Sequence, residues 1–218
     1  MANDAAKEVK APRASWVWPG VALAVVAAGF LGLDRWFYEH VSRVLNTEDQ
    51  PFDRDFYTLT KPLWLVCRFV FAHVLGGLAI YVAVLLLEPR RWRQTTAGLV
   101  AVLAAASLAN LAQVAIGRLR PNQADTHLAF TQPLAALSGR QHVSFPSGEA
   151  ATAVALACVL TRLFPRWKAA WYVLGTLGAV ARLVNGAHYV SDVAAGALLG
   201  SLLAGLTWPV AERRLAVR

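Results

Sequence analysis

The chain has 218 residues, of which 57% are hydrophobic and only 16% are charged, and its mean hydropathy is +0.45. This composition is too apolar for a soluble domain of this size and indicates a membrane protein. The formal net charge of +8 does not point to nucleic acid, because the basic residues lie in short loops between apolar runs and not on one polar stretch.

Six apolar runs follow one another along the chain, and most approach the ~20 residues that a transmembrane helix needs. We therefore predict an all-α polytopic membrane protein with six transmembrane helices in one bundle. The bundle occupies residues 16–210, between an N-terminal tail of residues 1–15 and a C-terminal tail of residues 211–218. The mixed polar and aromatic sequence of residues 34–41 predicts an amphipathic helix that lies on the membrane surface. The predicted spans are residues 16–33, 63–87, 97–116, 147–164, 169–184 and 190–210.

An even number of spans places both termini on the same side of the membrane. That side, with the loops at residues 88–96 and 162–168, carries 12 of the 21 lysines and arginines. The positive-inside rule then assigns the termini to the cytoplasm. We expect an integral protein of the bacterial inner membrane, whose loops after the third and fifth spans face the periplasm or the cell exterior.

The turn before the last apolar run carries an arginine, a histidine and an aspartate. His188 and Asp192 are four positions apart, so in a helix they lie on one face, where the carboxylate can hold an imidazole N–H. A histidine that is oriented by a carboxylate and lies near an arginine, here Arg182, is suited to act as a nucleophile that attacks phosphorus.

Two further polar stretches lie at the edges of apolar runs. One is Gly117-Arg118-Leu119-Arg120-Pro121, and the other is Phe145-Pro146-Ser147-Gly148-Glu149. The predicted topology brings both stretches and the 182–192 turn to the outer membrane surface. Ionisable groups at the ends of membrane spans are costly unless they are solvated or take part in function. This convergence favours a functional site over the alternative, a purely structural network of arginines and carboxylates.

Together the three stretches resemble the type 2 phosphatidic acid phosphatase superfamily, which includes the lipid phosphate phosphatases and the vanadium haloperoxidases. The family pattern is K-x6-R-P, then P-S-G-H, then S-R-x5-H-x3-D, on a helical bundle. The order and spacing match from Ala97 to Val210. The corresponding residues are Gln113-x6-Arg120-Pro121, Pro146-Ser147-Gly148-Glu149 and Ala181-Arg182-x5-His188-x3-Asp192.

Three positions depart from the family pattern. Gln113 replaces a lysine, so it can hydrogen-bond a phosphate oxygen but brings no charge. Ala181 replaces a serine, which removes one hydroxyl group. Glu149 replaces the histidine expected to protonate the leaving alkoxide, and a carboxyl group can do this only if it is protonated at the working pH.

The resemblance implies a role for each matching residue. His188 is the expected nucleophile, Asp192 fixes its tautomer, and Glu149 is the candidate general acid. Arg120 and Arg182 are expected to clamp the phosphoryl oxygens. The remaining phosphate-binding candidates are the backbone of Ser147 and Gly148 at a helix N-terminus, the amide of Gln113, and Arg118, whose alternative role is an arginine that snorkels at the interface.

No metal and no cofactor are expected, because the arginines supply positive charge and the cysteines, Cys67 and Cys158, lie in apolar runs. The expected partners are the bilayer and a phosphorylated lipid, with no nucleic acid, and the oligomeric state stays open. Among the substrate candidates are undecaprenyl diphosphate, phosphatidate, phosphatidylglycerophosphate and lipid A. A phosphotransferase and a catalytically silent protein that binds anionic lipid are the alternatives to a phosphatase.

Other polar residues receive structural interpretations. Arg68 is expected to snorkel, or to pair with Asp53 or Asp55. His73 is expected to be a packed or hydrogen-bonded helix residue of the second span. Arg140 and His142 form a candidate lid. The small residues at Gly196, Gly200 and Ala204 predict close packing within the bundle more readily than a dimer contact.

Overall fold

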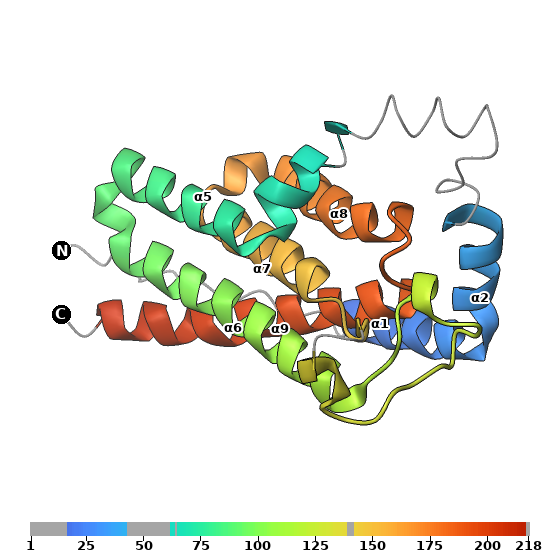
Figure 1. Cartoon of the computed structure of the whole chain (residues 1–218). Coiled ribbons are helices and arrows are strands. Elements are labelled where there is room, and N and C mark those ends of the chain that lie inside the picture. Colours follow the sequence, from blue (N-terminus) through green and yellow to red (C-terminus); the bar gives the residue numbers. More distant parts are fainter. Residues whose placement is uncertain (1–16, 43–61, 64, 139–141, 217–218) are drawn as a thin grey trace, which may run out of the picture.

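The computed structural model describes residues 17–42, 62–63, 65–138 and 142–216, and these residues form a bundle of helices (Figure 1). The predicted N-terminal tail, Asp53, Asp55 and Arg140 lie outside this part of the chain. The longer helices are α1 (Val17–Ala28), α5 (Val74–Leu87), α6 (Trp92–Ile116), α7 (Gly148–Leu163), α8 (Lys168–Val184) and α9 (Val190–Ala216).

The first helix does not end where the apolar run ends. It continues through a π-helical turn (Gly29–Leu33) into α2 (Asp34–Phe37) and a second π-helical turn (Tyr38–Ser42). Gly32 has a φ of 136°, which a residue with a side chain rarely adopts, and α2 turns away from α1 there (Figure 1). Residues 34–41 are helical as predicted, but Asp34 is buried in the protein and not directed to solvent.

The second predicted span is bent. Residues Leu65–Ala72 and Val74–Leu87 form two helical segments inclined by 64°. His73 has an extended backbone at the break, and its Nδ1 accepts the backbone N–H of Leu75 at 3.2 Å, which caps α5. The prediction of a continuous helix over residues 63–87 was therefore wrong at His73.

Three described helices are long and apolar enough to cross a membrane, namely Trp18–Val41, Pro89–Ile116 and Val190–Trp208, and the bent pair makes a fourth. Helices α7 and α8 have 16 and 17 residues, fewer than the ~20 of a typical span. The all-α membrane architecture is confirmed, while six crossings stay a prediction. Helix α9 continues to Ala216, beyond the predicted end of the last span.

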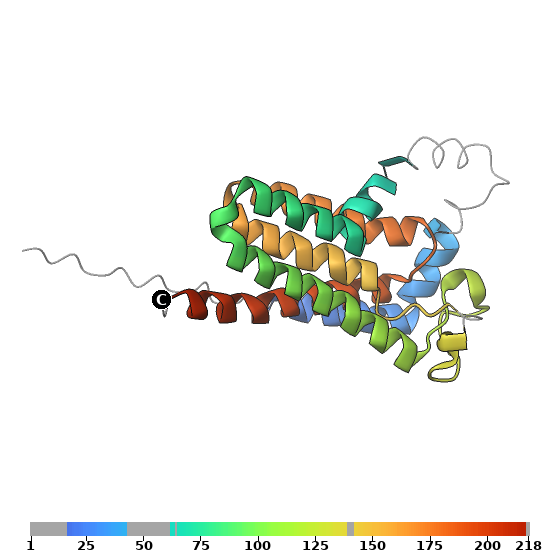
Figure 2. The same cartoon turned by 60° about the vertical axis from the view of Figure 1, so that its left-hand side comes forward.

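Helix α7 is the centre of the bundle, where it packs against α6, α8 and α9 (Figures 1 and 2). Close packing depends on glycine in α9. A Cβ atom on Gly196 would lie 2.3 Å from the carbonyl oxygen of Ser147, and one on Gly200 would lie 2.3 Å from that of Ala151. The prediction that these glycines serve packing within the bundle is confirmed.

All three motifs lie at one end of the bundle, on the right in Figure 1. The end of α6, the start of α7, the end of α8 and the start of α9 meet there, and residues 117–138 and 142–147 lie at the same end. The short turns at residues 88–91 and 164–167 lie at the opposite end. The packing therefore brings the three sequence-distant motifs together, as predicted.

Candidate active site

His188 lies in the turn between α8 and α9 and is 97% buried. Its Nδ1 is 2.9 Å from the carbonyl oxygen of Ser144. A carbonyl oxygen can only accept a hydrogen bond, so this contact places the ring proton on Nδ1 and leaves the lone pair on Nε2. Burial lowers the pKa of His188 below its ordinary value of 6.5, and the neighbouring carboxylate of Asp192 opposes that lowering.

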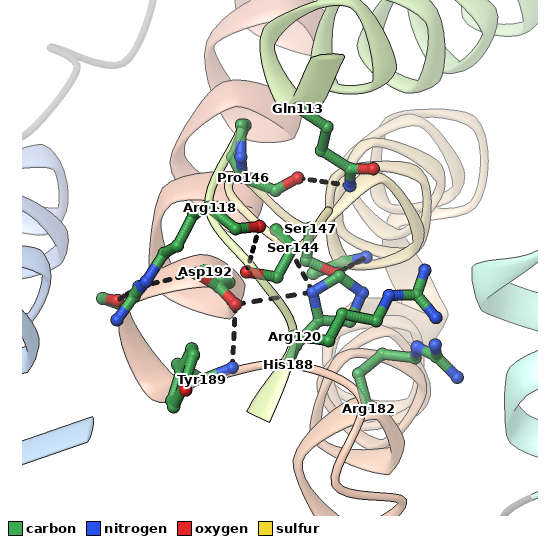
Figure 3. A network of polar contacts seen from close by, with 12 residues as sticks. Gln113, Arg118, Arg120, Ser144, Pro146, Ser147, Arg182, His188, Tyr189 and Asp192 are labelled. Atoms are coloured by element: carbon green, nitrogen blue, oxygen red, sulfur yellow. Dashed lines mark hydrogen bonds and ion pairs between the residues drawn. The ribbon is translucent and has the colours of Figure 1, made fainter. Parts of the chain in front are cut away.

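Asp192 is fully buried in the first turn of α9. Its Oδ2 accepts the backbone N–H of Tyr189 at 2.8 Å and lies 3.6 Å from Nδ1 of His188. The 3.6 Å distance is too long for a hydrogen bond. His188 precedes the helix, so the predicted single helical face was wrong. Asp192 acts on the imidazole as a nearby charge, and the carbonyl of Ser144 fixes the tautomer (Figure 3).

Arg118 occupies the interior behind Asp192 and has no exposed surface. Its Nη1 donates to Oδ1 of Asp192 and its Nη2 to Oδ2 of Asp34, both at 2.8 Å. Nε and Nη2 also donate to the carbonyl oxygen of His127, and the rings of Phe30 and Tyr189 lie 4.5 and 4.2 Å from its guanidinium carbon. This placement disagrees with both predicted roles, a phosphate contact and a snorkelling arginine.

Asp34 joins the N-terminal helix to the motif residues. One of its carboxylate oxygens accepts the backbone N–H of Ser191 at 2.9 Å, and the other accepts the hydroxyl of Ser191 and the guanidinium of Arg118. Asp34, Arg118 and Asp192 have fully buried side chains. We call Asp34, Arg118, Ser191 and Asp192 the buried network.

Arg120 and Arg182 lie on the other side of the imidazole from Asp192 (Figure 3). Arg120 follows a short β-bridge of Leu119 with Val143, and its Nε donates to the carbonyl oxygen of Val143 at 3.3 Å. Arg182 ends α8 and is 97% buried. Two guanidinium groups therefore lie on the Nε2 side of the imidazole, an arrangement that could clamp a phosphoryl group.

Glu149 stands between two arginines in the first turn of α7. Its Oε2 lies 2.9 Å from Nε of Arg182 and 3.1 Å from Nε of Arg68, and its Oε1 accepts Nη2 of Arg68 at 3.1 Å. Two positive partners stabilise a carboxylate ion and not a carboxylic acid. This arrangement does not favour Glu149 as general acid. Arg68, whose predicted partners Asp53 and Asp55 lie outside the described residues, pairs with Glu149 in the site.

The start of α7 is held from both sides. Ser147 caps the helix, with its hydroxyl accepting the N–H of Ala150, and its own N–H donates to the carbonyl oxygen of Asp192 at 2.9 Å. The amide of Gln113 donates to the carbonyl oxygen of Pro146 at 2.6 Å. The N–H of Ser147 thus supports the loop, which disagrees with its predicted phosphate contact. The phosphate contact of Gln113, whose amide keeps a second N–H, and the backbone contact from Gly148 stay predictions.

Sequence reasoning missed three contributors. Ser144 acts through its backbone carbonyl, which no side-chain pattern reveals. Asp34 was assigned to a surface helix, although an acid directly after an apolar run is a signal of a buried partner. Arg68 was interpreted as snorkelling. In the described part of the chain no group of three or more His, Cys, Asp or Glu residues is placed to hold a metal ion.

Comparison with known proteins identifies the family to which the chain belongs. The family model of the PAP2 superfamily matches residues 94–216, which include all three motifs. Curated relatives are described as lipid A 1-phosphatases. The one from Rhizobium johnstonii is 35% identical over 124 residues (49% of this chain, 50% of the relative). That from Rhizobium etli is 34% identical over 124 residues (49% and 53%). A third, from Porphyromonas gingivalis, is 28% identical over 109 residues (48% and 21%).

This chain therefore spans about half the length of the two Rhizobium relatives. A solved structure has a similar fold, that of a transmembrane PAP2 type phosphatidylglycerolphosphate phosphatase from Bacillus subtilis. The two chains align with a TM-score of 0.59 and 21% identity over 90% of this chain and 95% of the other. Because the family model covers more than half of the chain and its motifs form one site, the chain belongs to the PAP2 superfamily.

Proposed function

We propose that the protein is an integral membrane phosphatase that removes a phosphoryl group from a lipid phosphate, with His188 as nucleophile. The observation that carries this proposal is the hydrogen bond from Nδ1 of His188 to the carbonyl oxygen of Ser144, which leaves the lone pair of Nε2 beside Arg120 and Arg182. The relatives' description suggests the 1-phosphate of lipid A as the first substrate to test.

The chemistry has two steps. Nε2 of His188 attacks phosphorus, the bond between phosphorus and the lipid oxygen breaks, and the lipid leaves as an alkoxide that takes up a proton. Water then attacks the phosphohistidine, and inorganic phosphate leaves while Nε2 recovers its lone pair. Arg120 and Arg182 stabilise the charge that develops on the phosphoryl oxygens, and the charge of Asp192 stabilises the positive imidazole of the intermediate.

Phosphate release from pure protein in detergent tests this function. The panel contains lipid A with a 1-phosphate, phosphatidate, phosphatidylglycerophosphate and undecaprenyl diphosphate, each assayed with and without EDTA. We expect release from at least one lipid, unchanged by EDTA because the arginines supply the positive charge. Transfer of the phosphoryl group to an added lipid acceptor instead of water would indicate the phosphotransferase. Binding without release would indicate the silent protein, which the ion pairs of Glu149 with the site arginines favour.

The pH dependence follows from the buried imidazole. His188 must be neutral to attack, and its pKa is lowered by burial, so activity should persist at more acidic pH than for an ordinary histidine. We predict that the midpoint of the acidic limb, where kcat/KM falls as the pH is lowered, lies below pH ~6.5. Replacing Asp192 with Asn removes a charge that raises this pKa, so the limb should shift further to acid while the rate falls. A limb above 6.5, or one that moves to alkaline pH in Asp192→Asn, contradicts this assignment.

We further propose six membrane crossings, with the candidate active site on the periplasmic or outer face and both termini in the cytoplasm. The charge distribution supports this topology, and α7 and α8, although short, complete the bundle. Single cysteines at Asn122 and Gln94, in a Cys67→Ala, Cys158→Ala background, should react with an impermeant thiol reagent from opposite sides of the membrane. Reaction of both from the same side contradicts six crossings.

A further inference from the structure

Arg68 reaches the candidate active site from outside the family motifs. It begins a π-helical turn (Arg68–Ala72) just before the bend at His73, and it precedes residues 94–216 that the family model matches. The turn packs on α7 and α8, the helices that carry Glu149 and Arg182. About a third of the Arg68 side chain is exposed, so this guanidinium is accessible from solvent.

Three guanidinium groups surround one carboxylate in this site. Glu149 lies within 3.1 Å of both Arg68 and Arg182. Arg120 is close enough to feel these charges. Burial lowers its pKa, the negative charge of Glu149 opposes that lowering, and the positive charge of Arg68 adds to it. Three positive charges and one negative charge leave a net charge of +2, which matches a phosphate monoester dianion better than a diester monoanion.

The contact between Glu149 and Arg182 is incomplete. Nε of Arg182 lies 2.9 Å from Oε2 of Glu149, yet its buried N–H forms no hydrogen bond with any described residue because the direction is unsuitable. A buried N–H of this kind ordinarily finds an acceptor. A tetrahedral phosphoryl group offers three oxygens in place of the two of a planar carboxylate, so it can bond several guanidinium groups at once.

We propose that Arg68 is a third phosphate-binding arginine and that the Glu149 carboxylate holds the position of the substrate phosphoryl group until substrate displaces it. This inference rests on the proposed function for the identity of the substrate, but the binding of phosphate does not depend on turnover. Glu149 neutralises arginines that are costly to leave unpaired at the membrane edge. It also makes every phosphate ligand compete with an internal anion, which weakens binding.

Binding of inorganic phosphate to the full-length His188→Ala protein in detergent, measured by titration calorimetry, tests the inference without catalysis. Arg68→Gln should weaken binding about tenfold or more, the loss expected for a charged hydrogen bond, and Arg68→Lys should restore part of it. Glu149→Gln should tighten binding severalfold. Arg90→Gln is the matched control, because Arg90 is exposed in the Pro89–Arg91 turn at the opposite end of the bundle and its replacement should leave binding unchanged.

Two results overturn the inference. One is unchanged phosphate binding in a folded Arg68→Gln protein. The other is unchanged or weaker binding in Glu149→Gln together with a selective loss of kcat on lipid phosphates but not on an activated aryl phosphate, which is the behaviour of a general acid. If the parent protein releases no phosphate from lipids but the binding changes appear, the proposed function fails and this inference stands.

Discussion

Replacing His188 with alanine is expected to lower kcat on a lipid phosphate by at least about four orders of magnitude. The physical reason is that the hydrogen bond from Nδ1 to the carbonyl oxygen of Ser144 leaves the lone pair of His188 Nε2 free beside Arg120 and Arg182, and alanine has no such nitrogen. The measurement is phosphate release by purified wild-type and variant proteins at equal concentration, with folding checked by gel filtration and thermal unfolding.

His40 provides the control for this experiment. It is exposed, stacks on Trp36 and lies outside the site, so His40→Ala should leave activity unchanged. A His188→Ala protein that folds normally and retains wild-type activity would exclude the histidine nucleophile. Equal losses in both variants would point to a general effect on folding and not to chemistry.

Replacing Arg118 with methionine is expected to destabilise the protein by about 3–5 kcal/mol. The substitution keeps an apolar stem but leaves the buried carboxylates of Asp34 and Asp192 without their shared positive partner. For a chain of this length, the expected decrease in Tm is about 6–20 °C. Thermal unfolding in detergent, followed by tryptophan fluorescence, measures the change, and activity should fall with it because Asp192 loses the contact that positions it.

Arg35→Met is the matched control for stability. Arg35 also pairs with a carboxylate, but its side chain is 69% exposed, and exposed ion pairs contribute little to stability. Its Tm should stay within about 2 °C of the wild type. If Arg118→Met unfolds at the wild-type temperature, the buried network does not hold the N-terminal helix to the site.

The gathering of the three motifs was predictable because it depends on features that a sequence displays. Apolar runs define the helices, their order defines which ends meet, and Arg182, His188 and Asp192 keep the family spacing. Hydropathy cannot reveal which buried groups pair. Arg118 and Asp34 are 84 positions apart, and the packing of both α1 and α6 on α9 brings them together.

The errors have local physical causes. The break at His73 lies in an apolar run without proline, and its sequence signal is the pair Gly76-Gly77 just after it. A Cβ atom on Gly76 would lie 2.1 Å from the carbonyl oxygen of Phe69, so the bend needs glycine there. The exact start of α9 at Val190 placed His188 before the helix, which changed a predicted carboxylate contact into one with a backbone carbonyl. Gln113 has the spacing of a phosphate ligand, and one N–H of its amide already donates to the Pro146 carbonyl oxygen, a backbone contact that the sequence pattern does not reveal.

The most direct test of the account is the identity of the phosphorylated residue during turnover. Full-length protein should be mixed with a ³²P-labelled lipid phosphate, quenched in alkali within the first turnover, and digested for mass spectrometry. The account predicts an alkali-stable, acid-labile phosphoryl group on Nε2 of His188, absent in His188→Ala. Label on another residue, or phosphate release from lipid with no labelled protein at any quench time, would contradict it.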